Sequence, residues 1–173
     1  MSVKFVDEDS FVGFHLLNEG CFGVETLNQY IEQFHDYYLR KLLGQTKMDE
    51  LLANADNAEK RPTNADILAW FDPFCEESPC NCKDELESKG IPFMLTGLIY
   101  YEFTMSANYK QTASVGTKKV KSENANDANI TNSNTESDRR WNDAYFTFKA
   151  IWIKLNGCCK KLPKGMGVQA FGF

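Results

Sequence analysis

Apolar residues recur at helical spacing along most of this chain, and the clearest pattern lies near its C-terminus. One stripe repeats every three or four residues and predicts a helix over 141–155, with Asn134 or Thr135 as N-cap. The stripe comprises Trp141, Ala144, Tyr145, Phe148, Ile151, Trp152 and Leu155. Phe146 and Ile153 lie off this stripe, so the helix needs a second apolar partner, either in the same chain or across a subunit boundary.

Two helices are predicted in the first third of the chain. The first begins at Thr26, whose pairing with Gln29 resembles a capping box, and ends at Gly44, a residue typical of helix C-termini. A short helix follows over 48–55.

Two more helices are predicted in the middle of the chain. Thr63 opens one in which Ile67, Trp70, Phe71 and Phe74 share a face before prolines end it. Pro92 suits the first turn of the next helix, because proline has a fixed φ and no N–H to leave unpaired. The run 93–105 is apolar on almost every side, so this helix is expected to be central.

A long polar segment, 108–135, separates the last two predicted helices. A connection of this length is rare in a compact domain and indicates a working loop or disorder. Its first half alternates small polar residues around Gly116, which favours a short hairpin or an extended arm. Its second half is rich in asparagine and weakly hydrophobic, as disordered segments are. An arm that adds to a sheet edge of a neighbouring subunit is the alternative.

These patterns predict an all-α fold. We expect a small helical bundle with a long extended loop or short β-hairpin between the last two helices and an extended C-terminal tail. The expected divisions are an N-terminal extension (1–23), a helical domain (24–157, with its arm at 108–135) and a tail (158–173). The tail ends in Phe171 and Phe173, and it is interpreted either as a docking peptide or as a strand that covers the chain's own core.

Composition narrows the classes of function. A chain of 173 residues is long enough for one domain with a real core. The net charge of −5 and the pI near 5.1 argue against a protein that grips nucleic acid through a basic face. The N-terminus has no apolar stretch behind a basic start, and the run 93–105 is too short for a membrane span. We therefore expect a protein that is made and kept in a cytosol.

Candidate chemistry is sparse. Cys75, Cys80 and Cys82 lie close together, but their spacing is irregular for zinc, so unremarkable thiols are favoured over disulfides or a metal site. His15 and His35 are isolated and are interpreted as structural or surface residues. The sequence contains no phosphate-binding loop, nucleophile elbow or recognisable carboxylate pair. We expect no enzymatic activity and no cofactor.

Four short stretches resemble a known family. They are 39–44 (Leu-Arg-Lys-Leu-Leu-Gly), 98–103 (Leu-Ile-Tyr-Tyr-Glu-Phe), 115–124 (Val-Gly-Thr-Lys-Lys-Val-Lys-Ser-Glu-Asn) and 140–145 (Arg-Trp-Asn-Asp-Ala-Tyr). In this order they resemble the head-tail connector proteins of tailed bacteriophages, also called adaptor or head-completion proteins. The likeness covers 26–155 in order of elements, and its sharper motifs fill the last third of the chain. The cysteine-rich insertion 75–82 and the asparagine-rich half of the loop depart from the family pattern.

The resemblance implies a structural virion protein of the neck or connector region, made in the host cytoplasm. Such proteins are helical bundles that form a homo-oligomeric ring, commonly dodecameric, between the portal protein and the next tail or connector ring protein. The ring joins head to tail and lines the DNA passage without binding DNA specifically, and no membrane is involved. A heterologous ring interface needs two different surfaces, and the second apolar strip fits that need. A negative channel wall would let DNA slide, since lysine contacts to phosphates would hold it.

Candidate interface residues come from the resemblance and from the patterns above. From the resemblance they are Val115, Gly116, Thr117, Lys118, Lys119, Val120, Arg140, Trp141 and Asn142. From the patterns they are Phe146, Ile153, Phe171 and Phe173. The rival interpretation is a monomeric cytosolic helical module that binds another protein, and a metal-dependent enzyme built on the cysteines ranks third.

Overall fold

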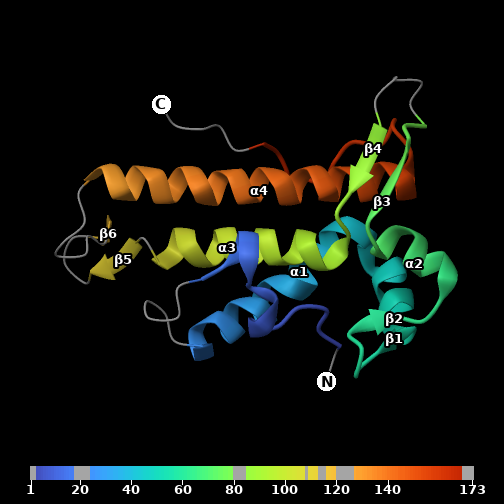
Figure 1. The fold of residues 1–173 in the computed structure, drawn as a ribbon, viewed down its shortest axis with the longest axis horizontal. Coiled ribbons are helices and arrows are strands. Elements are labelled where there is room, and N and C mark those ends of the chain that lie inside the picture. Colours follow the sequence, from blue (N-terminus) through green and yellow to red (C-terminus); the bar gives the residue numbers. More distant parts are fainter. Residues whose placement is uncertain are drawn as a thin grey trace.

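The structure, a computed structural model, describes residues 3–17, 24–79, 85–107, 109–112, 116–119 and 127–168. Within these ranges the α-helices are α1 (Val24–Ala53), α2 (Ala65–Phe71), α3 (Ile91–Ala107) and α4 (Asp127–Asn156). Two short 3-10 helices, η1 (Glu8–Ser10) and η2 (Gly13–His15), lie in the N-terminal segment. Figure 1 shows α3 and α4 side by side as the longest layer of the molecule, with α1 packed below them.

The prediction of an all-α fold is wrong, because the described residues also form three two-stranded antiparallel sheets. Strand β1 (Ala55–Asp56) pairs with β2 (Arg61–Pro62), β3 (Phe74–Glu77) with β4 (Glu85–Ser88), and β5 (Tyr109–Thr112) with β6 (Gly116–Lys119). Strands this short contain too few residues to display the two-residue alternation by which a strand is read from sequence. The fold is mixed, with helices dominant.

Glycine and asparagine set the ends of the first helices. Gly44 interrupts α1 with φ 69° and ψ 175°, so the predicted stop is confirmed, and the predicted short helix follows it directly to Ala53. Helix α2 begins one residue later than its predicted cap. The Asn64 side chain, rather than that of Thr63, accepts a hydrogen bond from the backbone N–H of Asp66 at 2.8 Å.

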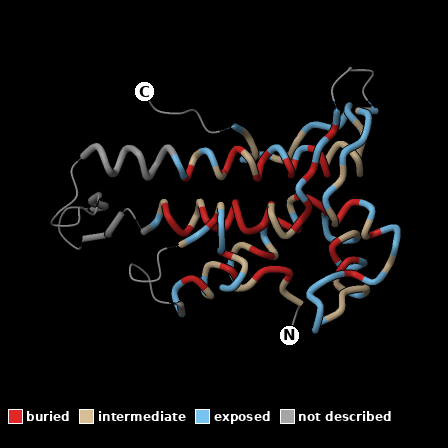
Figure 2. The backbone as a smooth tube through the Cα atoms, viewed as in Figure 1, coloured by how far each residue is buried: buried red, intermediate tan, exposed pale blue. Residues whose placement is uncertain are grey.

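Helix α3 is the centre of the fold, as predicted. Pro92 occupies its first turn, and the side chains of Met94, Leu95, Leu98 and Ile99 are completely buried. Figure 2 shows buried residues along much of α3. Gly97 lets α4 approach closely, since a Cβ at this position would lie 2.8 Å from the Cβ of Ala144. Helices α3 and α4 are therefore in direct contact within the core.

Helix α4 confirms the predicted stripe and corrects its start. Trp141, Ala144, Tyr145, Phe148 and Ile151 are all buried. The helix already begins at Asp127, so the predicted caps at 134–135 lie inside it. Asparagine, serine and threonine have low helix propensity, so residues 127–133 show no helical pattern in the sequence.

The loop between α3 and α4 contains a hairpin, one of the two forms predicted for it. Strands β5 and β6 pair in register from Tyr109 opposite Lys119 to Thr112 opposite Gly116. Figure 1 shows this hairpin at one end of the α3–α4 pair and the β3–β4 hairpin at the other end. The remaining loop positions, 113–115 and 120–126, lie outside the described residues.

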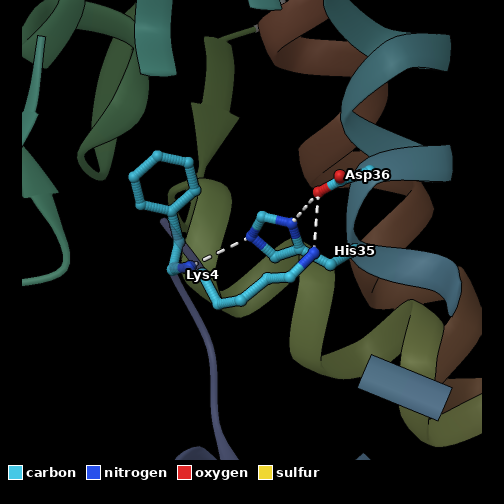
Figure 3. A network of polar contacts seen from close by, with 4 residues as sticks. Lys4, His35 and Asp36 are labelled. Carbon is cyan, nitrogen blue, oxygen red and sulfur yellow. Dashed lines mark hydrogen bonds and ion pairs between the residues drawn. The ribbon is translucent and has the colours of Figure 1, made fainter. Parts of the chain in front are cut away.

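The segment 3–17, expected to be an extension, packs into the core. Phe5, Val6 and Phe11 are buried among the core residues. The backbone N–H of Phe5 donates to Nε2 of His35 at 3.0 Å, and Nζ of Lys4 lies 3.0 Å from a carboxylate oxygen of Asp36 (Figure 3). This segment is therefore fastened to α1 by both apolar and polar contacts.

The chain after α4 also covers the core. Leu162 and Met166 pack against it, and the indole N–H of Trp141 donates to the carbonyl oxygen of Gly167 at 2.8 Å. The described part of the predicted tail, 158–168, therefore contacts the chain's own core. No helix in the described ranges is both long and apolar enough to cross a membrane.

Candidate functional site

A groove of about 600 Å³ lies between β4 and the C-terminal half of α4. Its apolar lining includes Leu86 of β4 and Phe146, Ala150 and Ile153 of α4. Leu86 and Ala150 are buried and Ile153 is half-buried, whereas Phe146 is 53% exposed. The second apolar strip of α4 thus meets β4 of the same chain along part of its length and leaves one phenyl ring open to solvent.

The rim of the groove is charged. Glu85 and Glu87 alternate with buried residues along β4 and are exposed. Across the groove, Lys89 lies 3.9 Å from a carboxylate oxygen of Asp143, and its ammonium group also lies 4.8 Å from the ring centroid of Phe93. Lys89 is therefore already engaged. Glu85 and Glu87 line the β4 side of the rim, and the exposed Lys149 lines the α4 side.

The β3–β4 hairpin contains an unfavourable charge pair. Glu77 lies directly opposite Glu85 in the register, and like charges at opposite positions destabilise a hairpin. Among the described residues, no lysine or arginine forms an ion pair with either carboxylate. The neighbouring Glu76 does pair with Lys154 of α4, which fastens the hairpin to the helix.

One cysteine lines the same groove. Cys158, which lines it, is disulfide-bonded, so of the three alternatives for the cysteines a disulfide holds at this position. A disulfide is unusual in a reducing cytosol, the compartment expected from the sequence. Cys75 and Cys159 are free and exposed. Local desolvation of the thiol and the nearby Glu85 carboxylate raise the pKa of Cys75, which disfavours the nucleophilic thiolate.

A metal site is not formed by the described residues. No group of three or more histidine, cysteine, aspartate or glutamate side chains within the described ranges could hold an ion. Cys80 and Cys82, the other members of the predicted cluster, lie outside these ranges.

A second cluster joins the N-terminal segment to the α3–α4 pair. His15 of η2 is 4% exposed, and its ring centroid lies 4.8 Å from that of Phe93. Burial, with a smaller effect of the nearby Arg140 guanidinium, lowers the pKa of His15 to about 4, so the imidazole is neutral near neutral pH. The Arg140 guanidinium stacks 4.2 Å from the Tyr100 ring centroid and donates to its hydroxyl. These contacts lock the segment rather than form an open site.

The sequence-predicted interface residues fall into three groups. Phe146 and Ile153 come together in the groove. Trp141 and Asn142 are buried, and Arg140 packs on Tyr100, so these three are used within the chain. Residues 116–119 form β6 at the far end of the molecule, whereas Val115, Val120, Phe171 and Phe173 lie outside the described residues.

Sequence reasoning missed the β4 side of the groove. Its signal is a single alternation, Glu85-Leu86-Glu87-Ser88, with exposed glutamates and buried partners. Four residues of alternation are too few to separate a strand from a polar loop.

Comparisons with family models, with curated proteins and with solved structures found no match for this chain.

Proposed function

We propose that this protein is a structural subunit of the virion that assembles into a ring between portal and tail, joins head to tail and lines the DNA passage. The proposal combines the resemblance of the four sequence stretches to head-tail connectors with one structural observation. That observation is the presence of two unlike surfaces at opposite ends of the α3–α4 pair.

The first surface is the groove beside β4. Phe146 is more than half exposed in the isolated chain, and Leu86, Ala150 and Ile153 line the groove with it. Complete burial of a phenylalanine side chain contributes roughly 1.5–3 kcal/mol, so an occupant of the groove would gain from covering this ring. An apolar groove that the chain's own residues leave partly open, with charged residues at its edge, is typical of a protein–protein interface.

The second surface is the β5–β6 hairpin. It consists of only two strands in the described residues, so each strand has an edge with unpaired backbone groups. Figure 1 places the hairpin at the end of the α3–α4 pair opposite the β3–β4 hairpin. Two different surfaces at opposite ends favour head-to-tail association, which closes into a ring when the rotation between subunits permits it.

The charge of the chain supports a passive role toward DNA. The net charge is −5, and a connector must let DNA slide past without holding it. Acidic side chains repel the phosphates of DNA and release no counterions from it. An acidic channel wall therefore does not bind the DNA that passes through it.

The mass of the assembled particle tests this proposal. Purified full-length protein should be measured by analytical ultracentrifugation across a wide concentration range, alone and mixed with the portal protein of the same phage. We expect a discrete ring-sized species, visible as rings by negative-stain electron microscopy. A species that stays monomeric under both conditions would overturn the proposal and favour the rival, a monomeric module that binds another protein through the groove.

A further inference from the structure

The two histidines of the chain both lie where the N-terminal segment meets the rest of the fold. We name residues 3–17 the N-terminal strap, since they pack against the helices and place Phe5 and Phe11 in the core. His15 belongs to the strap, and His35 of α1 contacts it. Both imidazoles are buried, at 4% and 0% exposure. Imidazole is the side chain whose ordinary pKa lies closest to neutral pH, so the strap contact holds both groups that could respond to mild acid.

His35 holds the strap through a contact that needs a neutral ring. Its Nε2 accepts the backbone N–H of Phe5 at 3.0 Å, while Nδ1 lies 2.7 Å from a carboxylate oxygen of Asp36 (Figure 3). Protonation of Nε2 would direct an N–H at the N–H of Phe5, so the hydrogen bond would become a contact between two donors. The charged groups beside the ring are Asp36, which favours a positive charge on it, and Lys4 of the strap, which opposes one. A charged His35 therefore removes a buried hydrogen bond from the strap.

His15 fastens the strap to the α3–α4 pair. Its Nε2 atom is buried and has no hydrogen-bond partner within the described part of the chain. In the charged ring this atom carries an N–H, which would be buried there without an acceptor. The charged groups that face the ring are Arg140 and Asp143 of α4 and Lys89 just before α3. Of the three, the Arg140 guanidinium has the largest effect, and it repels a second positive charge. Tyr100 of α3 also lies beside the ring, and burial raises the pKa of its hydroxyl, which stays neutral.

We propose that the strap is an acid-sensitive latch, which detaches from α1, α3 and α4 when His15 and His35 take up protons. The three helices stay packed on one another, because their contacts are made by apolar residues such as Leu39, Leu98 and Phe148, all fully buried. Burial of these side chains does not change with protonation, since none of them titrates. The inference concerns the single chain and does not depend on the ring assembly proposed above.

The ion pairs that attach the strap do not respond in the same pH range. Among the described residues they are Lys4 with Asp36 and Lys60 with Asp7. An aspartate ordinarily titrates near about pH 4 and a lysine near about pH 10, so both pairs stay charged between pH 7 and pH 5. Mild acid therefore acts on the strap through its two histidine contacts.

The pKa values of the two rings set the size of the expected effect. Burial is the largest cause at both positions, and it lowers the pKa of His15 and of His35 from 6.5 to about 4. Detachment exposes both rings to water and returns each pKa toward its ordinary value. Between pH 7 and pH 5, proton uptake then raises the equilibrium constant for detachment by roughly twentyfold for each ring. The two rings together raise it by roughly 400-fold, since their contributions multiply.

Hydrogen exchange of the full chain at pH 7 and pH 5 tests the inference. The exchange rate of each backbone amide is divided by its intrinsic rate at that pH, which gives protection factors for the strap and for α3. Protection of the strap should fall by roughly a hundredfold or more at pH 5. Helix α3 should stay better protected than the strap at both pH values, with unchanged helix content by circular dichroism. Equal strap protection at the two pH values would overturn the inference. Loss of strap protection only together with that of α3 would also overturn it, because the whole chain then unfolds.

Glutamine variants test whether the histidines are responsible, since a glutamine oxygen can accept the Phe5 N–H but does not titrate. In His15→Gln with His35→Gln, strap protection should differ by less than about threefold between pH 7 and pH 5. Each single variant keeps one titrating ring and should show a change of roughly tenfold to thirtyfold, which also serves if the double variant does not fold. Asp7→Asn is the matched control, because it removes the ion pair with Lys60 but no histidine. It should lower strap protection by a similar factor at both pH values. Glutamine variants that keep the full pH dependence of the wild type would overturn the inference.

Discussion

The imidazole of His35 accepts a hydrogen bond from the backbone N–H of Phe5 at 3.0 Å, although the two residues are 30 positions apart in the chain. The other ring nitrogen, Nδ1, lies 2.7 Å from a carboxylate oxygen of Asp36, to which it donates (Figure 3). A nitrogen that accepts carries no proton, so this arrangement requires the neutral ring. Burial lowers the pKa of His35 to about 4, which is consistent with that requirement.

Stability should fall on acidification because both buried histidines must be neutral in the folded chain. The pKa values of His15 and His35 drop from 6.5 to about 4 on folding, so protonation favours the unfolded chain. The neutral rings contribute to the free energy of unfolding above about pH 6.5, and this contribution is lost as the pH falls toward about 4. The loss is on the order of 3 kcal/mol for each ring. Urea denaturation across this range measures the loss.

A variant without one imidazole provides the control for this pH dependence. His35→Leu should reduce the pH-dependent part of the free energy of unfolding by about half, since His15 remains. It should also lower stability at neutral pH by roughly 1–3 kcal/mol, because the Phe5 N–H loses its acceptor in a buried site. A wild-type stability that stays constant through this pH range would contradict the assignment of neutral rings.

Gly97→Ala should destabilise the fold at the closest approach of α3 and α4. The new Cβ would lie 2.8 Å from the Cβ of Ala144 and 3.1 Å from Nε2 of His15, both in the packed core. Forced separation of two packed helices costs typically about 1–3 kcal/mol. Gly167→Ala is the matched control, since no atom lies within 4 Å of its added Cβ, and its stability should equal that of the wild type in thermal denaturation. Equal stability of the two variants would show that the helices can separate freely at this point.

Trp141→Phe should loosen the segment after α4 without unfolding the protein. The substitution keeps an aromatic ring near Tyr101 but removes the N–H that donates to Gly167. Loss of one such hydrogen bond costs about 1 kcal/mol. Hydrogen exchange of backbone amides in 157–168 should accelerate more than exchange in α3. Unchanged protection of this segment would mean that Leu162 and Met166 hold it alone.

The sequence predicted the helices well because their signals are long. The stripe from Trp141 to Ile151 spans three helical turns, and Gly44 marks a stop that few other residues could form at φ 69°. The strands β1 to β4 were missed because each has four residues or fewer, and Phe74 fitted equally well on a helix face.

The α4 side of the groove could also be predicted from the sequence. Phe146 and Ile153 stood out because they break the stripe of α4, and the structure places both in the groove. The opposing wall came from β4, whose contact with α4 depends on how distant segments fold together and leaves no local pattern. Charges at facing strand positions, such as Glu77 and Glu85, become apparent only when the register is known.

Phe146→Glu should abolish ring assembly and leave the fold intact, since the phenyl ring is 53% exposed and lines the groove. Exposed substitutions usually change stability by less than about 0.5 kcal/mol, whereas a carboxylate beside Glu85 and Glu87 opposes any partner that covers the groove. Tyr37→Glu is the matched control, because Tyr37 is an exposed aromatic residue on α1, 47% exposed, outside the groove. Sedimentation velocity and thermal denaturation should be run on both variants. We expect the Tyr37 variant to assemble like the wild type and the Phe146 variant to remain monomeric with an unchanged melting temperature. Normal assembly of the Phe146 variant would remove the groove from the interface, because no close-packed contact over this ring could accept a charged side chain without loss of affinity.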